Sequence, residues 1–436
     1  MLKIIQLSIM LLLFLSDSAM SSSNEPYAYP LENPYAATIV GTPQEFKAKL
    51  PGYQDLPVDE YTLKIPGGRE IPDVFWYERS GLRYAITAQD TQAPLVFAIA
   101  GTGAGHRSAK MKLFQRAFYQ AGYHVVTISS PTVSNFILNA STTGIPGNLK
   151  DDSVDLYQVM QLIKNKHTNL AVSDYFLIGY SLGASQAAFV AQQDEQEKIF
   201  QFKKVMMINP PLSLFNSVVV LDKMLDDNVP GRFASFNDYF NNVIANVTAY
   251  HKTNQKINFM SSDFFYNAYR EKRPDDYNLQ ALIGIAFRMS SSNMIFVSDV
   301  FNNLGYLVPK DTTLTKTTSL TNYAKSARRT GFSEYVNEVY VPYFTQTSGM
   351  SQQQIIDASS LLSIKDYLQS SDKIAMMHNE DDPILQPGEI GQLKSLFPDR
   401  AKIYPYGGHC GNMEYKDNVA YMVGFFNGDV LSGSKN

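Results

Sequence analysis

The chain contains very little cysteine: one residue, Cys410, in 436. An intramolecular disulfide is therefore impossible, and zinc or iron–sulfur sites built from several cysteines are excluded. Charge is also scarce, since charged residues make up 18% of the chain and the formal net charge is −4. A nucleic-acid-binding protein usually carries a strongly basic surface. The composition therefore argues against that class, and we expect no nucleic-acid partner.

Motifs for cofactors and metals are missing as well. The chain has no Gly-Lys-Ser or Gly-Lys-Thr, which a P-loop requires, and no His-Glu-x-x-His zinc motif. Gly101-Thr-Gly-Ala-Gly follows an apolar stretch, as a dinucleotide-binding loop does, but the third glycine is not at the offset that such a loop uses. We therefore predict no cofactor and no metal ion.

Only one long hydrophobic run is present, and it lies at the N-terminus. Ile4 to Leu15 is mostly apolar, follows Lys3, and precedes small and polar residues. This pattern is typical of a secretory signal peptide over residues 1–20, with cleavage after Ser18. The run is too short for a membrane span, which needs about 20 residues, although an uncleaved N-terminal anchor is an alternative. We expect a secreted or periplasmic protein without a stable membrane span in its mature form.

The rest of the chain has ample material for a packed core, because apolar residues make up 44% and aromatic residues 12% of the sequence. Short apolar runs alternate with helical patterns, which predicts a mostly parallel sheet flanked by helices. The strands expected from this rhythm are 74–77, 84–86, 95–100, 124–129, 175–180, 205–209, 373–377 and 401–404. The helices expected between or after them are 110–121, 151–166, 182–192 and 416–426.

The segment 210–372 breaks this rhythm and is expected to be mainly helical. The helices predicted in it are Phe233–Tyr250, Asn278–Met289, Tyr335–Tyr343 and Ser351–Ser359. We therefore divide the chain into a signal peptide (1–20), an N-terminal extension (21–60), an α/β core (61–209 and 373–436) and a helical insertion (210–372).

The most informative motif is Gly179-Tyr-Ser-Leu-Gly183, which follows an apolar strand and precedes an alanine-rich helix. A serine nucleophile on a sharp strand-to-helix turn needs small residues on both sides, because larger side chains would collide with neighbouring backbone. The turn exposes the oxygen of Ser181 at the positive end of the following helix. An ordinary strand-to-helix turn is the alternative interpretation.

With this motif in this context, the chain resembles the α/β-hydrolase superfamily. The resemblance implies an acid after a later strand and then a histidine. The family usually places its acid one residue before an x-Ile or x-Val pair, which selects Asp382, followed by Pro383 and Ile384. Asp381 is the runner-up and Glu380 a weaker alternative. A solvated acidic loop that caps a helix is the non-catalytic interpretation.

The histidine implied by the resemblance is His409, in Gly407-Gly-His409 after the last predicted strand. The glycines allow the loop to bring the imidazole toward the serine. His378, next to the acidic loop, is a second choice. Cys410 is interpreted as a small apolar packing residue.

In this hypothesis His409 takes the proton of Ser181, and Asp382 fixes the tautomer of the imidazole and stabilises its charged form. The oxyanion needs two backbone N–H donors. Leu182 is expected to supply one and Thr102 the other, with Gly103 as the second choice at that position. The family often begins this loop with His-Gly, whereas here Ala100 precedes Gly101.

The family also implies that an insertion after the sixth strand forms a cap over the active site and selects substrates. The aromatic side chains of the segment 210–372 could form an apolar substrate pocket. The alternative is that they only pack against one another and hold the cap together. We expect a serine hydrolase that acts on a small acyl ester or peptide substrate. An esterase or lipase is the first hypothesis, a peptidase or thioesterase the second, and an inactive binding protein the third. The sequence does not indicate an oligomeric state.

Overall fold

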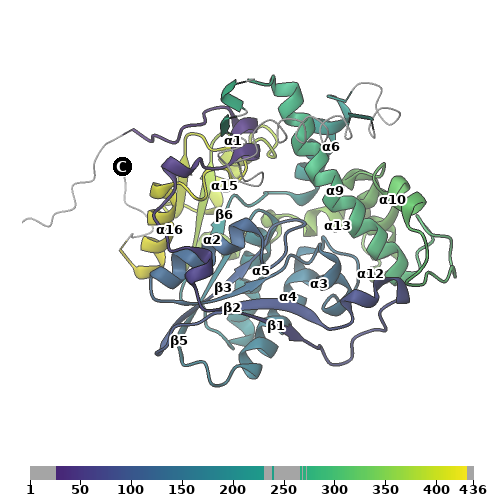
Figure 1. Cartoon of the computed structure of the whole chain (residues 1–436), viewed down its shortest axis with the longest axis horizontal. Coiled ribbons are helices and arrows are strands. Elements are labelled where there is room, and N and C mark those ends of the chain that lie inside the picture. Colours follow the sequence, from purple (N-terminus) through teal and green to yellow (C-terminus); the bar gives the residue numbers. More distant parts are fainter. Residues whose placement is uncertain (1–25, 230–237, 240–265, 268, 272, 430–436) are drawn as a thin grey trace, which may run out of the picture.

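A computed structural model describes residues 26–229, 238–239, 266–267, 269–271 and 273–429. The predicted signal peptide and most of the predicted helix Phe233–Tyr250 lie outside these residues. Eight strands form one sheet in the order β1-β2-β4-β3-β5-β6-β7-β8 (Figure 1). The strands are β1 (Val58–Leu63), β2 (Leu82–Thr87), β3 (Ala93–Ile99), β4 (His124–Ile128), β5 (Val172–Tyr180), β6 (Val205–Ile208), β7 (Ile374–Asn379) and β8 (Ala401–Tyr404).

The sheet is mostly parallel, as predicted. Strand β2 pairs antiparallel with β1 and β4, and every later pair, from β4 to β8, is parallel. The carboxyl ends of parallel strands meet at one edge of a sheet, which is where α/β proteins usually bind ligands. The turn after β5 and the loops after β7 and β8 therefore converge.

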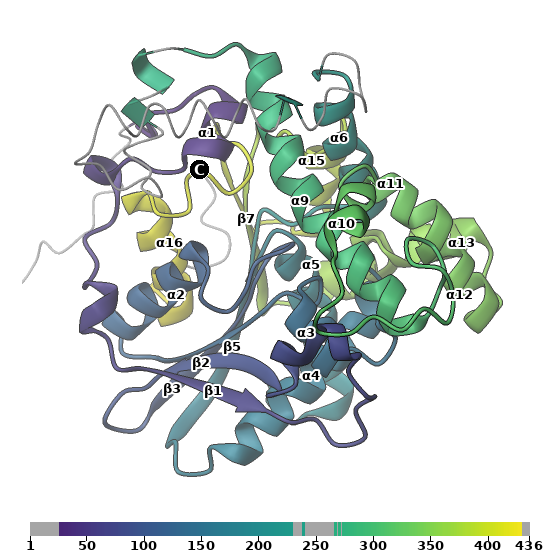
Figure 2. The same cartoon turned by 45° about the vertical axis from the view of Figure 1, so that its right-hand side comes forward.

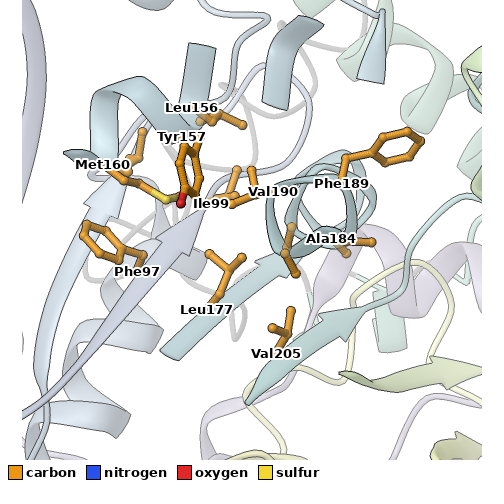
Figure 3. Close-up of a cluster of buried hydrophobic side chains, with 14 of the residues drawn as sticks. Phe97, Ile99, Leu156, Tyr157, Met160, Leu177, Ala184, Phe189, Val190 and Val205 are labelled. Carbon is orange, nitrogen blue, oxygen red and sulfur yellow. The ribbon is translucent and has the colours of Figure 1, made fainter. Parts of the chain in front are cut away.

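Helices cover both faces of the sheet. The core helices are α2 (Ala109–Gln120), α3 (Ser134–Asn139), α4 (Leu149–Lys166), α5 (Leu182–Glu197), α14 (Lys365–Ser370), α15 (Glu389–Leu396) and α16 (Lys416–Asn427). Helices α2 and α16 pack on one face, and α3, α4, α5, α14 and α15 contribute to the core on the other. Figure 3 shows part of the core on the face covered by α4 and α5. There Phe97, Ile99 and Leu177 of the strands face Tyr157 of α4 and Val190 of α5.

Between β6 and β7 the described chain is helical. Besides α14, the elements are α6 (Leu214–Asp226), α9 (Asp276–Asn302), α10 (Thr321–Ala327), α11 (Phe332–Tyr335), a π-helix η4 (Val336–Tyr340), α12 (Val341–Ser348), α13 (Gln352–Ala358) and a 3₁₀ helix η5 (Leu361–Ile364). Figure 2 shows α9 to α13 together beside the core. Phe296, Phe332, Tyr340 and Phe344 pack in one cluster of this region, so many of its rings hold it together.

In the part of the chain that the structure describes, one helix, α9, is long and apolar enough to cross a membrane by length and composition alone. Of its most apolar 18-residue window, 61% is buried within the protein. A helix in the core of a folded domain meets the same criteria, and α9 packs against α6.

Near the N-terminus one predicted strand is wrong, and one strand, β1, was not predicted. The predicted strand Val74–Tyr77 is wrong: the residues form a 3₁₀ helix, η3 (Asp73–Glu78). A short apolar run does not distinguish a strand from a buried turn of helix, and here Val74 and Phe75 are buried whereas Trp76 is exposed. Residues 21–60, predicted as an extension, contain a helix, α1 (Pro34–Val40), two 3₁₀ turns, η1 (Gln44–Phe46) and η2 (Tyr53–Asp55), and the start of β1.

Candidate active site

Ser181 lies at the turn between β5 and α5, in a backbone conformation that few residues adopt. Its φ is 54° and its ψ is −130°. A side chain with Cβ is strained at such a φ, and strain of this kind persists only where the surrounding structure imposes it. The serine is buried but lines a cavity. The turn therefore holds one hydroxyl in a fixed place at the carboxyl edge of the sheet.

The two glycines of the motif are required by close backbone packing. A Cβ on Gly183 would lie 2.5 Å from the carbonyl oxygen of Ile99 and 2.6 Å from that of Ala100. A Cβ on Gly179 would collide with the carbonyl oxygen of Gly183. Since the atoms met are backbone atoms of adjacent elements, no side-chain rearrangement can make room.

His409 connects Ser181 to a buried carboxyl group. Its Nε2 lies 2.8 Å from Ser181 Oγ, and its Nδ1 lies 2.9 Å from Asp382 Oδ2. Burial opposes the charged imidazolium, but the Asp382 carboxylate and the neighbouring Cys410 together outweigh burial and raise the pKa of His409. Burial likewise acts to raise the pKa of Asp382, but His409, with smaller contributions from His378 and Asn209, outweighs burial and lowers that pKa. The contact between His409 and Asp382 therefore favours the protonated imidazole next to an ionised carboxylate.

Asp382 is fixed in turn by two donors. Asn209 Nδ2 donates to Asp382 Oδ2 at 2.9 Å, and the Ile384 N–H donates to Oδ1 at 3.2 Å. Asn209 follows β6 and was not among the site residues predicted from the sequence. Its position just after a strand, at the edge where the other polar residues gather, is the signal that could have identified it.

The alternatives considered for the acid and the base have other partners. Asp381 accepts the N–H groups of Gly407 and Gly408 at 3.2 and 3.0 Å, and burial raises its pKa to about 6. Glu380 pairs with Lys394. His378 lies 3.9 Å from Asp382, but its Nδ1 accepts the N–H of Asn379 at 2.9 Å and its Nε2 lies 3.2 Å from the carbonyl oxygen of Pro210. The structure thus brings His409 and Asp382 to Ser181.

The predicted oxyanion donors, Thr102 and Leu182, line the same cavity as Ser181. Leu182 is the first residue of α5, where N–H groups of the first turn have no partner within the helix. The second choice at the other position, Gly103, donates its N–H to Thr132 Oγ1 at 2.8 Å. That N–H is already used, which favours Thr102.

The cavity beside Ser181 is apolar and bounded by both the core and the helical segment. Its volume is about 60 Å³. None of the described residues that line it carries a charge. The apolar side chains from residues 210–372 that line it include Leu214, Val218, Leu221, Phe287, Met294 and Phe332.

The tyrosine hydroxyls of this wall are directed to other protein groups. Tyr335 donates to the carbonyl oxygen of Pro146 at 2.9 Å, and Tyr340 lies 2.7 Å from Ser359 Oγ. Because these hydroxyls are hydrogen-bonded, the two residues present mainly their rings to the cavity. Within the described residues, no group of three histidine, cysteine or carboxylate side chains could hold a metal ion.

The fold and this arrangement define a hydrolase-type α/β protein, and comparison with known families gives the same class. The family model of the alpha/beta hydrolase fold matches residues 105–415. The chain belongs to this family.

Similar solved structures include proteins with several activities. A serine hydrolase from the polyaromatic-hydrocarbon-degrading bacterium Cycloclasticus zankles is 12% identical, with a TM-score of 0.42 over 85% of this chain and 99% of that one. The thioesterase domain from the curacin biosynthetic pathway is 12% identical, with a TM-score of 0.37; the match covers 85% of this chain and 99% of that one. The acylaminoacyl peptidase of Pyrococcus horikoshii is 10% identical, with a TM-score of 0.42; the match covers 87% of this chain and 43% of that one. No curated protein matches the chain.

Proposed function

We propose that the protein is an exported serine hydrolase that cleaves carboxylic esters, with Ser181, His409 and Asp382 as its catalytic residues. The observation that carries the proposal is a pair of short hydrogen bonds. One joins Ser181 Oγ to the imidazole of His409, and the other joins that imidazole to the carboxylate of Asp382. A nucleophile, a base and a group that orients the base are the minimum for acyl transfer through a covalent intermediate.

In the first half of the reaction, Ser181 Oγ attacks the acyl carbon while His409 Nε2 takes the hydroxyl proton. The N–H groups of Leu182 and Thr102 stabilise the negative charge on the former carbonyl oxygen. The bond to the alkoxy group then breaks, and His409 returns its proton to the departing oxygen, which leaves as an alcohol. Ser181 remains acylated.

In the second half, His409 takes a proton from a water molecule as that water attacks the acylated Ser181. The resulting oxyanion collapses, the proton passes to Ser181 Oγ, and a carboxylic acid leaves. Asp382 stays ionised throughout and stabilises the imidazolium at each proton transfer. The lowered pKa of Asp382 supports this role.

The apolar cavity supports an uncharged acyl group as the substrate portion bound beside Ser181. Burial of each methylene of such a group contributes about 0.8 kcal/mol. An aminopeptidase would instead need a carboxylate to pair with the substrate amine, and no charged side chain of the described residues lines this cavity. Thioester cleavage uses the same acyl intermediate and is the second candidate, because the cavity would accept the same acyl group.

A panel of substrates tests this proposal. We expect turnover of p-nitrophenyl esters, with kcat/KM rising with acyl-chain length until the cavity is filled. We expect turnover of aminoacyl p-nitroanilides to be at least about 100-fold slower, since an unpaired ammonium group is costly to bury. Acyl-CoA analogues of the same chain lengths would separate thioesterase from esterase activity. Absence of turnover of every ester, or preferred cleavage of the anilides, would contradict the proposal.

Export is proposed on the sequence alone. Lys3 and the apolar run that follows it support recognition by the secretory pathway. A secreted protein with one cysteine and no internal disulfide fits a bacterial periplasm or culture medium better than a eukaryotic secretory pathway. N-terminal sequencing of the exported protein should give a chain that starts at Ala19. Retention of the intact N-terminus in the cytoplasm would contradict export.

A further inference from the structure

The loop that carries His409 contacts a helix from the far N-terminus of the chain. Thr38 of α1 accepts the backbone N–H of His409 on its Oγ1 at 2.8 Å, and the same hydroxyl donates to the carbonyl oxygen of Pro34 at 2.7 Å. Just after α1, Thr42 donates to the carbonyl oxygen of Gly411 at 3.0 Å. Two hydroxyls therefore hold the backbone on both sides of the imidazole.

The histidine loop has a backbone that needs such support. Gly408 has a φ of 57°, and Cys410, which carries a Cβ, has a φ of 60°. A conformation of this kind persists only where surrounding groups fix it. On one side Asp381 and Asn379 fix the loop, since Asp381 accepts its N–H groups and Asn379 Nδ2 donates to the carbonyl oxygen of Gly408 at 2.7 Å. On the other side the support comes from α1.

The fit between α1 and the loop is close. A Cβ on Gly408 would collide with the carbonyl oxygen of Pro34, and a Cβ on Gly411 would collide with that of Ala37. Backbone packed directly on backbone leaves the loop little room to move. Helix α1 also contacts α9, and Figure 2 shows α1 near the top of the molecule, above α16.

Helix α1 is itself anchored at its N-terminus and to the helical segment. Asn33 caps α1 by accepting the N–H of Ala36 at 2.9 Å, and its Nδ2 donates to Asp276 Oδ1 at 2.7 Å. Upstream, the hydroxyl of Tyr27 accepts from Asn412 Nδ2 at 2.8 Å and donates to Asn418 at 3.0 Å. The N-terminal segment is therefore built into the structure around His409.

We propose that α1 positions the catalytic base, with Thr38 as the positioning residue that keeps His409 Nε2 on Ser181 Oγ. This inference rests on the proposed function of the same site. Helix α1 lies outside residues 105–415, which the family model matches. Thr38 touches neither the serine nor the space beside it and acts only through the backbone of His409.

Loss of the Thr38 hydroxyl should affect the chemical step more than substrate binding. The N–H of His409 would lose its acceptor, and the loop would relax toward a less strained backbone. The imidazole would then spend less time in line with Ser181 Oγ. The apolar cavity is formed by other residues, so KM should change little.

The test compares Thr38→Val, which keeps the shape and removes the hydroxyl, with Thr38→Ser, which keeps the hydroxyl, and with Thr62→Val at an exposed site on β1. With the best p-nitrophenyl ester, we expect kcat of Thr38→Val to fall about 10-fold with KM unchanged. The rate of fluorophosphonate labelling should fall in parallel. Thr38→Ser should regain most of the activity, and Thr62→Val should match wild type.

A second variant acts on α1 without touching the histidine loop. Asn33→Ala removes the helix cap and the hydrogen bond to Asp276. We expect a smaller loss of kcat, about 3-fold, because α1 is weakened while the Thr38 hydroxyl remains. The inference is overturned if Thr38→Val keeps the wild-type kcat, whether or not its melting temperature falls, or if only KM changes. A wild-type protein that neither reacts with the probe nor hydrolyses esters would instead contradict the proposed function.

Discussion

At the scale of single residues, Asp381 and Asp382 are adjacent in the chain but have different partners. Asp382 faces His409 and has a lowered pKa because His409, together with His378 and Asn209, outweighs the effect of burial. Asp381 faces the backbone N–H groups of Gly407 and Gly408, and burial raises its pKa to about 6. In the proposed function, Asp382 stabilises the protonated imidazole of His409, and Asp381 holds the backbone of the loop that carries His409.

Exchange of each acid for its amide should therefore give different results. We expect Asp382→Asn to lower kcat about 10³- to 10⁴-fold, because the amide favours the wrong tautomer of His409 and cannot stabilise the imidazolium. We expect Asp381→Asn to lower kcat less than about 10-fold, since an amide oxygen can still accept one of the two N–H groups. Similar losses in both variants would contradict the division of roles.

The pH dependence gives a second comparison of the same variants. His409 must be neutral to take the proton from Ser181, so kcat/KM should rise as pH rises through the pKa of His409. Since Asp382 raises that pKa, the acidic limb of wild type should lie above pH 6.5, the ordinary pKa of histidine. The limb should move to lower pH in Asp382→Asn and stay in place in Asp381→Asn.

At the scale of elements, the turn between β5 and α5 was predictable because it depends on local sequence. Gly179 and Gly183 flank Ser181, and the apolar strand and alanine-rich helix are next to them in the chain. Strands β2 to β8 and helices α2, α4, α5 and α16 were predictable for the same reason, whereas β1, α3, α14 and α15 were not predicted. The 3₁₀ helix at Asp73–Glu78 was not, since its four apolar residues fit a strand equally well.

Substitution of glycine by alanine tests how closely the turn is packed. We expect Gly183→Ala to lower the free energy of unfolding by about 3 kcal/mol, because its Cβ would press on the carbonyl oxygens of Ile99 and Ala100. The control is Gly391→Ala in α15, where a Cβ would meet nothing within 4 Å. That change should raise the free energy of unfolding by about 0.5–1 kcal/mol. Urea unfolding of both variants measures the difference, and equal effects would contradict the packing argument.

At the scale of the whole molecule, the site combines residues that are far apart in the chain. Ser181, His409 and Asp382 could be predicted because the family order and the glycine motifs mark them in the sequence. The support from Thr38 could not, since it depends on a contact between residues 371 positions apart. No periodicity or motif near Thr38 indicates that contact. Asn209 is intermediate, since the end of a predicted strand marks its position but not its partner.

Two parts of the molecule pack around the candidate active site at the carboxyl edge of the sheet. Helices between β6 and β7 supply much of the apolar cavity wall. The N-terminal segment packs on the histidine loop and is hydrogen-bonded to α9 through Asn33 and Asp276. In the proposed function the first of these selects the acyl group, and the second keeps the base in place.

The role of Ser181 as an activated nucleophile is tested most directly by labelling with a fluorophosphonate probe, followed by intact-mass analysis. The probe reacts covalently with a serine that a neighbouring base activates. We predict that the wild-type protein gains one probe per chain, that peptide mapping places it on Ser181, and that Ser181→Ala and His409→Ala are not labelled. Labelling that persists in Ser181→Ala, or a folded wild-type protein that is not labelled, would contradict this role.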